Sequence, residues 1–413
     1  MPGLFAYVID TNRKIYPFGE PVSSLTVGNE SIGAAQERVF GSLGFQVKKI
    51  QNPDQITQEG CLLTYDNVFL TRRVVRDFLK AVRTTGGSAR CALPKSLFTE
   101  LTTPGTGLSY EDHPIGKVVP YNLFYLSEKA SWNKDKLDAL PRVVPRFREK
   151  VVSSPVPSRL VSEKYQYSVT SSVIFHIDNW FHLYRANMQA LTIRWVEQIL
   201  GHKVWTIFKL LLSLPGLPFH GFWSLAKRFN TRKKGCKIHP TALVELSHLG
   251  KGVHIGARAI VRGCIIGDGT YISDGSHLQY TVMGKRCFTS KSTILNGVVS
   301  FSDSDVCPAM QVSIVGRNCS LTARSWILDI NLKGTVKIFD GVKVVDTGTS
   351  YLGACIGNGV KVGFDVVIGH GRAVPNDLTL VRDDSDVLRK APSNLPKGVP
   401  LLIRNGIPVQ KDD

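Results

Sequence analysis

Two aspartates in the first half of the chain, Asp66 and Asp178, are candidates for a metal site. Carboxylate oxygens are the hard ligands that usually hold Mg²⁺ against phosphates. Metal-assisted attack of one phosphate on another needs only positioning and charge neutralisation, so this chemistry is one expectation. The alternative is structural: Asp66 would cap the element that begins at Asn67, and Asp178 would cap a helix over 180–191.

Four histidines in the second half, His248, His254, His277 and His370, could act as general bases. An imidazole can take a proton from an acceptor hydroxyl or amine. Arg372 follows His370 closely and is a cation that could hold a phosphate. We select His254 and His370 as the candidate catalytic bases, and an ordinary surface position is the alternative for each.

Residues 189–235 combine an apolar helical stripe with a cluster of cations. Helices with aromatic residues on one side and Lys or Arg nearby can lie in a membrane interface, and each cation adds roughly 1 kcal/mol at an anionic surface. The stripe could equally pack between two domains or against a second subunit. The expected membrane contacts are Trp205, Phe208, Phe222, Trp223, Arg232, Lys233 and Lys234.

The chain of 413 residues carries 51 Lys and Arg against 33 Asp and Glu, a formal net charge of +18. This charge favours anionic partners such as phosphorylated small molecules or an acidic membrane surface. Nucleic acid is not an expected partner, because the basic residues form no recognisable binding module. The hydrophobic content of 43% excludes wholesale disorder.

The eight cysteines are scattered and form no CxxC pair, which argues against a disulfide framework or a zinc site. The N-terminus has no basic segment followed by an apolar one, so no secretory signal is expected. The most apolar stretch, 195–214, is too polar for a standard spanning helix. We expect a cytoplasmic protein, and peripheral contact with the inner face of the membrane is an open alternative.

Aliphatic residues recur every six positions from Ile238 onward, separated by Gly, Asn and Asp. One hexad makes a short strand and a corner, with the aliphatic side chain pointing inward. Three hexads make a triangular coil, and stacked coils bury an aliphatic column. About seven to eight coils of roughly 18 residues fit between Cys236 and Val381. The expected inward residues are Leu249, Ile255, Ile260, Ile266, Ile272, Leu278, Val315, Leu321, Ile327, Ile356, Val362, Ile368 and Val374.

This pattern is interrupted over 300–311 and over 331–350. Insertions in a solenoid form loops on one face, often the binding face, and tolerated surface variation is the alternative. The repeat resembles the hexapeptide-repeat family. That resemblance implies a left-handed parallel β-helix and assembly as a homotrimer through this domain. In many members it also implies acyl transfer between neighbouring subunits, with a histidine as the base.

Three segments of the first half resemble sugar-phosphate nucleotidyltransferases: 21–32 (PVSSLTVGNESI), 62–67 (LLTYDN) and 176–187 (HIDNWFHLYRAN). The first is similar to the family's Pro-Lys-Pro-Leu-Leu-Pro-Val-Gly-Asn segment. The second and third are similar to its strand-end Gly-Asp and its late Trp-x-Asp segment. The resemblance implies an α/β domain that binds a nucleotide or a sugar phosphate. It also implies that Asp66 and Asp178 hold Mg²⁺ and that Arg13 contacts phosphate. Asn29 is a further candidate phosphate contact, and Lys14 can replace the missing family lysine only if the loop takes a different shape.

The chain departs from this family at the phosphate-binding loop. Glycine-rich loops bind phosphate because bare backbone N–H groups can approach it closely, but residues 9–14 (IDTNRK) contain no glycine. Arg13 matches the family arginine, whereas Val22 stands where the family has a lysine. A domain that keeps the sheet and has lost the chemistry is the favoured interpretation of this half.

The predicted organisation has four parts: an α/β domain over 1–188, a linker over 189–235, a left-handed β-helix over 236–381 and an extended tail over 382–413. This organisation is consistent with three hypotheses about function. The chain is a nucleotidyltransferase-like protein, active or degenerate, that binds or forms a nucleotide sugar. Alternatively, it is an acyltransferase that works on the β-helix, or a non-catalytic scaffold associated with a membrane.

Overall fold

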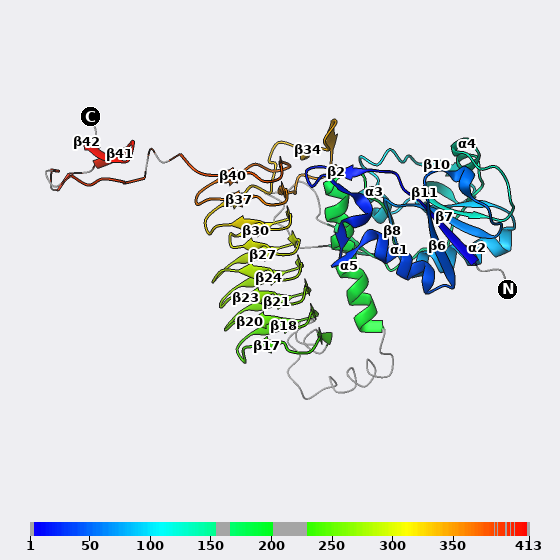
Figure 1. The fold of residues 1–413 in the computed structure, drawn as a ribbon, viewed down its shortest axis with the longest axis horizontal. Helices are drawn as coiled ribbons and strands as arrows, with labels where there is room; N and C mark the ends of the chain where they lie inside the picture. Colours follow the sequence, from blue (N-terminus) through cyan, green and yellow to red (C-terminus); the bar gives the residue numbers. More distant parts are fainter. Residues whose placement is uncertain are drawn as a thin grey trace.

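A computed structural model describes residues 4–153, 166–200 and 229–410, apart from 384, 386, 393, 394, 397 and 400. A mixed α/β domain occupies the first half, and a stack of short parallel strands occupies the second (Figure 1). The order of an α/β domain and then an all-β repeat domain is therefore confirmed. Helix α5, Trp180–Leu200, stands between the two parts, and the boundary expected after residue 188 falls inside it.

A seven-stranded sheet forms the centre of the α/β domain. Its strands are β1 (Leu4–Ile9), β6 (Phe45–Ile50), β7 (Cys61–Tyr65), β9 (Ala89–Pro94), β10 (Glu111–His113), β11 (Gly116–Leu126) and β12 (Arg142–Val143). They follow the order β12-β9-β11-β7-β1-β6, and β10 pairs with β11. Strand β1 is parallel to β6 and to β7, so the carboxyl ends of these three strands meet at one edge. Ligands of open α/β sheets bind outside such an edge.

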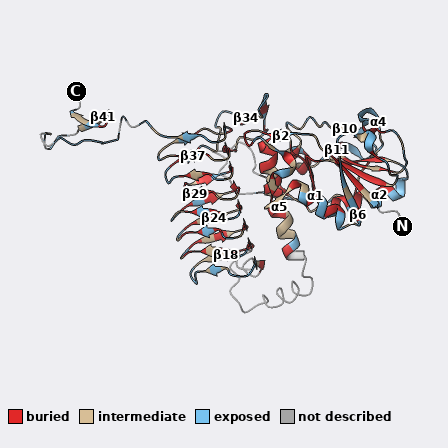
Figure 2. Cartoon of the chain, viewed as in Figure 1, coloured by how far each residue is buried: buried red, intermediate tan, exposed pale blue. Residues whose placement is uncertain are grey.

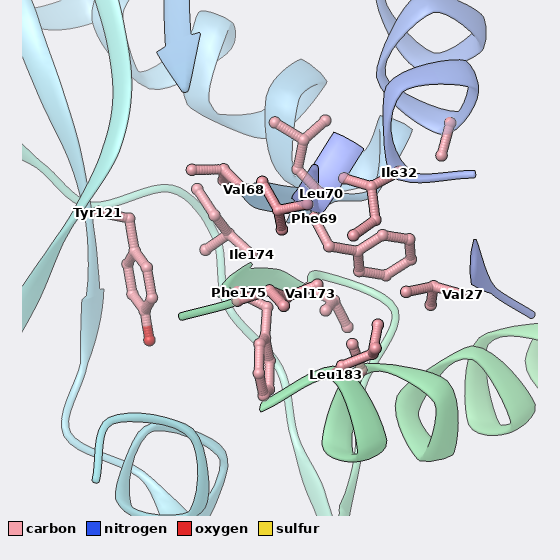
Figure 3. Close-up of a cluster of buried hydrophobic side chains, with 14 of the residues drawn as sticks. Val27, Ile32, Val68, Phe69, Leu70, Tyr121, Val173, Ile174, Phe175 and Leu183 are labelled. Atoms are coloured by element: carbon pink, nitrogen blue, oxygen red, sulfur yellow. The ribbon is translucent and has the colours of Figure 1, made fainter. Parts of the chain in front are cut away.

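Helices and small strand pairs complete this domain. The other helices are α1 (Ile32–Gly41), α2 (Arg72–Thr85), α3 (Leu97–Thr102) and α4 (Lys134–Asp138), with short 3₁₀ turns at Val22–Ser24 and Pro53–Gln55. The pairs are β2 (Lys14–Ile15) with β3 (Glu20–Pro21), β4 (Thr26–Val27) with β5 (Glu30–Ser31), β8 (Val68–Leu70) with β15 (Ile174–His176), and β13 (Lys150–Ser153) with β14 (Gln166–Val169). Side chains from β4, β8, β15 and α5, among them Val27, Phe69 and Leu183, meet in the core (Figure 3).

The second half winds through three parallel sheets, as a parallel β-helix does. The first sheet holds β16 (Thr231–Arg232), β19 (His248–Leu249), β22 (Ile265–Ile266), β25 (Val282–Met283), β28 (Val299–Ser300), β31 (Ile314–Val315), β36 (Cys355–Ile356) and β39 (Ala373–Val374). The second holds β17 (Lys237–Ile238), β20 (His254–Ile255), β23 (Tyr271–Ile272), β26 (Phe288–Thr289), β29 (Asp305–Val306), β32 (Ser320–Leu321), β37 (Lys361–Val362) and β40 (Thr379–Leu380). The third holds β18 (Leu243–Glu245), β21 (Ile260–Arg262), β24 (His277–Gln279), β27 (Ile294–Asn296) and β30 (Met310–Gln311), followed by the pair β33 (Trp326–Ile327) and β38 (Val367–Ile368).

Each early coil contains 17 residues, one fewer than expected, because one of its three corners is shorter. The prediction that Ile260 points inward is wrong. Val261 is fully buried in the coil interior and Ile260 lies on the outer side of β21. The slip in the six-residue period therefore falls between Val261 and Ile266. The other expected inward residues are all buried in the interior cluster, which confirms the aliphatic column.

The centre of the α/β domain is buried (Figure 2). In the first sheet of the coil, the strands β22, β25, β28, β31 and β36 are buried on both sides, unlike the strands of the second sheet. In β23 the outward residue, Tyr271, is exposed, as strand alternation predicts for a solvated face. The outward residues of the first sheet are apolar instead and pack in one cluster with the core of the α/β domain. These residues are Ile265, Val282, Val299, Ile314 and Cys355. The two parts of the chain therefore share a hydrophobic core, which we call the seam.

The two interruptions of the repeat have different structures. Residues 300–311 are no insertion: they supply β29 and β30 within a coil shortened to 15 residues. Residues 331–350 form an insertion that carries the antiparallel pair β34 (Lys337–Phe339) and β35 (Val344–Asp346). Within it, Ile338 and Val345 are buried in the seam cluster, and the rings of Phe339 and Tyr16 meet at 5.5 Å. This loop therefore fastens the α/β domain to the coil.

The C-terminal segment leaves the stack after β40. It ends in the hairpin of β41 (Leu401–Arg404) and β42 (Ile407–Gln410), which lies beyond the end of the coils and away from both domains (Figure 1).

The seam predicts different costs for the same substitution on two faces of the coil. Val299→Ala removes buried methyl groups between the domains, so we expect a loss of about 1–3 kcal/mol in the free energy of unfolding. The matched control is Val367→Ala, at an outward position that is 59% exposed, where a change within about 0.5 kcal/mol is expected. Urea unfolding of the full chain measures both. Equal losses would contradict the assignment of Val299 to a shared core.

Candidate functional site

The carboxyl ends of β1 and β7 gather the predicted residues of the first half. Asp66 follows β7 directly, and its Oδ1 accepts hydrogen bonds from the hydroxyl of Thr11 at 2.7 Å and from the Thr11 backbone N–H at 3.2 Å. Arg13, in the segment after β1, forms an ion pair with Asp178. Arg13, Asp66 and Asp178 therefore lie together at one edge of the sheet.

The segment after β1 closes on itself. Beyond the bond from Thr11 to Asp66, the Asn12 N–H donates to Asp10 Oδ1 at 2.8 Å, and the Arg13 N–H donates to Thr11 Oγ1 at 3.3 Å. Three successive backbone donors thus have acceptors inside the protein. In a glycine-rich loop such donors are open to a phosphate. Here side-chain oxygens of the chain take the place of phosphate oxygens.

Val22, which stands where nucleotidyltransferases have a lysine, lies in the hydrophobic core. Val22 is fully buried, and its backbone N–H donates to the carbonyl of Arg13 at 2.9 Å. Lys14, expected as a replacement cation, lies exposed in β2 opposite Pro21. Asn29, the third expected phosphate contact, donates from Nδ2 to the carbonyl of Met283 at 2.7 Å. That bond joins Asn29 to the coil, away from the edge of the sheet.

Asp178 is fixed by its neighbours and does not cap α5. Its Oδ1 accepts from Asn67 Nδ2 at 2.8 Å in addition to Arg13. The residue that caps the helix is Asn179, whose Oδ1 accepts the backbone N–H of His182 at 3.0 Å. The alternative that Asp178 caps the helix is therefore wrong, because the next residue, Asn179, is the cap. The alternative for Asp66 is wrong as well, because its bonded oxygen accepts from Thr11 and not from the element that follows it.

The donor set at this edge does not fit Mg²⁺ in the arrangement seen here. Among the residues that the structure describes, no three His, Cys, Asp or Glu side chains converge as metal ligands. Two buried oxygens, Asp66 Oδ2 and Asn67 Oδ1, accept no hydrogen bond within that part of the chain. Asp178, however, is already neutralised by Arg13. Joint binding of Mg²⁺ by Asp66 and Asp178 stays a prediction, and it requires Arg13 to release Asp178.

Two buried histidines, His176 and His182, form hydrogen bonds with backbone groups close to the site. His182 Nε2 lies 2.7 Å from the carbonyl of Pro104, and its Nδ1 accepts the N–H of Asp178. His176 Nε2 accepts the N–H of Asn122 at 3.1 Å, so this nitrogen carries no proton. Burial and the charge of Arg90 lower the pKa of His176 to about 3, and burial also lowers the pKa of His182. Both rings are therefore neutral near pH 7.

Burial acts in the opposite direction on Asp66. It raises the pKa of this carboxyl, and the hydrogen bonds from Thr11 oppose the rise.

Sequence reasoning missed Asp10, Thr11 and Asn67 as partners of the site. A signal existed for the first two, because the polar run Asp10-Thr11-Asn12 directly follows a buried strand.

The candidate bases of the coil lie far apart in the stack. His254 is in β20 of an early coil, and its ring stacks on Tyr271 at 4.5 Å. Tyr271 stacks in turn on Phe288 at 5.7 Å. His370 lies in a late coil, after β38. Within the described residues neither imidazole forms an ion pair with a carboxylate that would orient it, so their role as bases stays a prediction.

The basic linker is described in part. Arg232, Lys233 and Lys234 are exposed, and Arg232 belongs to β16 of the first coil. The expected membrane contacts Trp205, Phe208, Phe222 and Trp223 lie outside the described residues. Across the ranges that are described, no helix has both the length and the apolar character needed to cross a bilayer.

A scan against protein-family models and a search of curated proteins give no match to this chain.

The buried histidines predict that stability falls with acid. A lowered folded-state pKa means that the stabilisation is complete above the unfolded value of about 6.5 and is lost as pH falls toward the folded value. For His176 that window runs from about 6.5 down to about 3, with a slope of up to about 1.4 kcal/mol per pH unit. Urea unfolding between pH 7.5 and 5.5 measures it.

The slope is assigned to His176 by substitution. His176→Asn removes the titrating group, so this variant is expected to lose less stability than the unmodified chain over the same pH range. His239→Asn, at an exposed histidine of the first coil, is expected to keep the original slope. An unchanged slope in His176→Asn would show that this ring does not carry the effect.

Proposed function

We propose that this chain is a sugar-phosphate nucleotidyltransferase-like protein whose N-terminal site no longer transfers nucleotides. Support for the family comes from the order of an α/β domain, a connecting helix and a coil of short repeats. It also comes from the meeting of Arg13, Asp66 and Asp178 at the carboxyl edge of the sheet. Within this proposal the coil is left-handed, as in hexapeptide-repeat proteins, and the chain assembles as a homotrimer through it.

The loss of nucleotidyl transfer is inferred from one observation, the closed segment after β1. Its backbone donors at Thr11, Asn12 and Arg13 are bonded to oxygens of Asp66, Asp10 and Thr11. A triphosphate would have to displace two carboxylates to reach these donors, and the freed carboxylates would repel it. The ion pair of Arg13 with Asp178 removes a further cation from the phosphates. The domain then serves as a folded partner of the coil.

The first test is a pyrophosphate-release assay. The purified chain is given the four NTPs, a panel of sugar 1-phosphates and Mg²⁺, with Asp66→Asn in parallel. We expect no release above the blank for either protein. Release that depends on Mg²⁺ and disappears in Asp66→Asn would overturn the proposal and would assign the metal to Asp66.

A second test has a positive readout. In a relic site the internal hydrogen bonds are structural, so Thr11→Val should destabilise the fold by about 1.5–3 kcal/mol, the usual worth of a hydrogen bond to a charged group. In a site kept open for a substrate, the same change is expected to be neutral or stabilising. The matched control is Thr379→Val, at an exposed strand position whose hydroxyl has no hydrogen-bond partner among the described residues. Urea unfolding distinguishes the two cases.

A further inference from the structure

A cavity of about 570 Å³ lies between the α/β domain and the first coils, away from the closed segment after β1. The turn between β4 and β5, helix α1, the start of α2 and helix α5 form its α/β side. The first coils form the other side. Its volume is within the range of small-molecule sites, about 300–1,000 Å³. Neither domain makes this cavity alone, so it exists only because the seam holds the two together.

The cavity has an apolar floor and a charged rim. Val39, Phe69, Ile193 and Ile265 provide apolar surface. The rim carries five cations, Arg38, Arg72, Arg194, Lys233 and Lys285, against three acids, Glu30, Glu197 and Asp268. A ligand with an apolar or ring-shaped body and an anionic group matches these two surfaces.

The acids neutralise only part of the rim. Glu30 forms a bidentate pair with Arg38, and Glu197 lies 3.5 Å from Arg194. No ion pair involves Arg72, Lys233 or Lys285 within the described residues. These three cations come from α2 and from two different coils, so they approach the cavity from opposite sides.

The carboxylate of the third acid, Asp268, accepts a hydrogen bond from the backbone. Its Oδ1 accepts the N–H of Lys251 at 2.7 Å. This bond lowers the pKa of the carboxyl, and the charges of Lys233 and Lys285 lower it further. On the same wall, burial and the charges of Arg194 and Lys233 lower the pKa of His248 to about 4. Asp268 in turn raises the pKa of His248, so its negative charge offsets part of the cationic charge on this wall.

His248 adds an oriented hydrogen-bond donor. Gln198 Nε2 donates to Thr231 Oγ1 at 2.9 Å, and this oxygen lies 2.5 Å from His248 Nδ1. In the tautomer in which the Thr231 hydroxyl donates to Nδ1, the proton of the neutral ring is on Nε2. An anionic oxygen in the cavity can accept this proton as a hydrogen bond.

We propose that this cavity binds a small molecule that carries a phosphate group. Arg72, Lys233 and Lys285 contact the phosphate, His248 donates to one of its oxygens, and the apolar floor holds the rest of the ligand. Charge-assisted hydrogen bonds of this kind are short and strong. The phosphate can belong to a soluble phosphate ester or to a lipid headgroup. The site is separate from the edge of the sheet and does not depend on the proposed loss of nucleotidyl transfer.

The test compares two double variants of the full chain. Lys233→Gln with Lys285→Gln removes two rim cations. Lys234→Gln with Lys291→Gln removes two exposed lysines of the same coils that do not line the cavity. The net charge is the same in both, so a general electrostatic effect cancels. Thermal unfolding confirms that each variant is folded, which is expected because all four side chains are exposed.

Binding is measured in two arms. One uses calorimetry with inorganic phosphate, glucose 1-phosphate and glycerol 3-phosphate. The other uses cosedimentation with phosphatidylcholine vesicles, with and without phosphatidic acid. We expect the unmodified chain to bind in one arm, with affinity about tenfold lower or more in Lys233→Gln with Lys285→Gln. A change below about threefold is expected in the control pair.

The arm that responds identifies the source of the phosphate. Calorimetric binding indicates a soluble ester, and binding only to vesicles with phosphatidic acid indicates a lipid. The proposal is overturned if the unmodified chain binds none of these probes, or if the two double variants lose affinity equally. Neither outcome bears on the pyrophosphate assay, so failure of this proposal and failure of the proposed function remain distinguishable.

Discussion

The structure depends on the burial of one outer face of the coil. Outward residues of a β-helix normally meet solvent, as Tyr271 does, but along the first sheet Ile265, Val282, Val299 and Ile314 pack against the α/β domain. The N-terminal domain has a core of its own, and the coil has an aliphatic column of its own. The seam joins the first core to the outer side of the coil. Burial of this face packs the two parts against each other and sets the position of the cavity between them.

The edge of the sheet has a structural role in the same arrangement. Asp66 accepts two hydrogen bonds from Thr11, and Arg13 pairs with Asp178, which lies two residues before α5. Helix α5 stands between the two domains (Figure 1). Side chains suited to phosphate and metal become fasteners between β1, β7 and α5. A catalytic site must keep strained or unsatisfied groups open for its substrate, whereas here most of these groups find partners inside the protein.

At the cavity between the α/β domain and the first coils, in contrast, several charged side chains have no ion-pair partner among the described residues. The chain has a large excess of cations, and two lysines of the first coils face a cavity whose acids are already paired or bonded. A cationic rim over an apolar floor costs stability through like-charge repulsion unless an anion is bound. The convergence of Arg72, Lys233 and Lys285 on one hollow is the observation that supports the proposed binding of a phosphate.

The sequence by itself determined the class of the second domain, because the six-residue period of buried aliphatic residues is a local property of each coil. The α/β class of the first domain was expected from the resemblance of its three segments to nucleotidyltransferases. Arg13, Asp66 and Asp178 were indicated by the same resemblance, because each stands at a position that matches one of its motifs. Tertiary structure decided the rest. The period could not distinguish Ile260 from Val261, because both are aliphatic and only the shortened corner selects one. The pairing of Arg13 with Asp178 and the cavity beside Lys233 bring together residues from distant parts of the chain, and those contacts depend on how the seam docks the two domains.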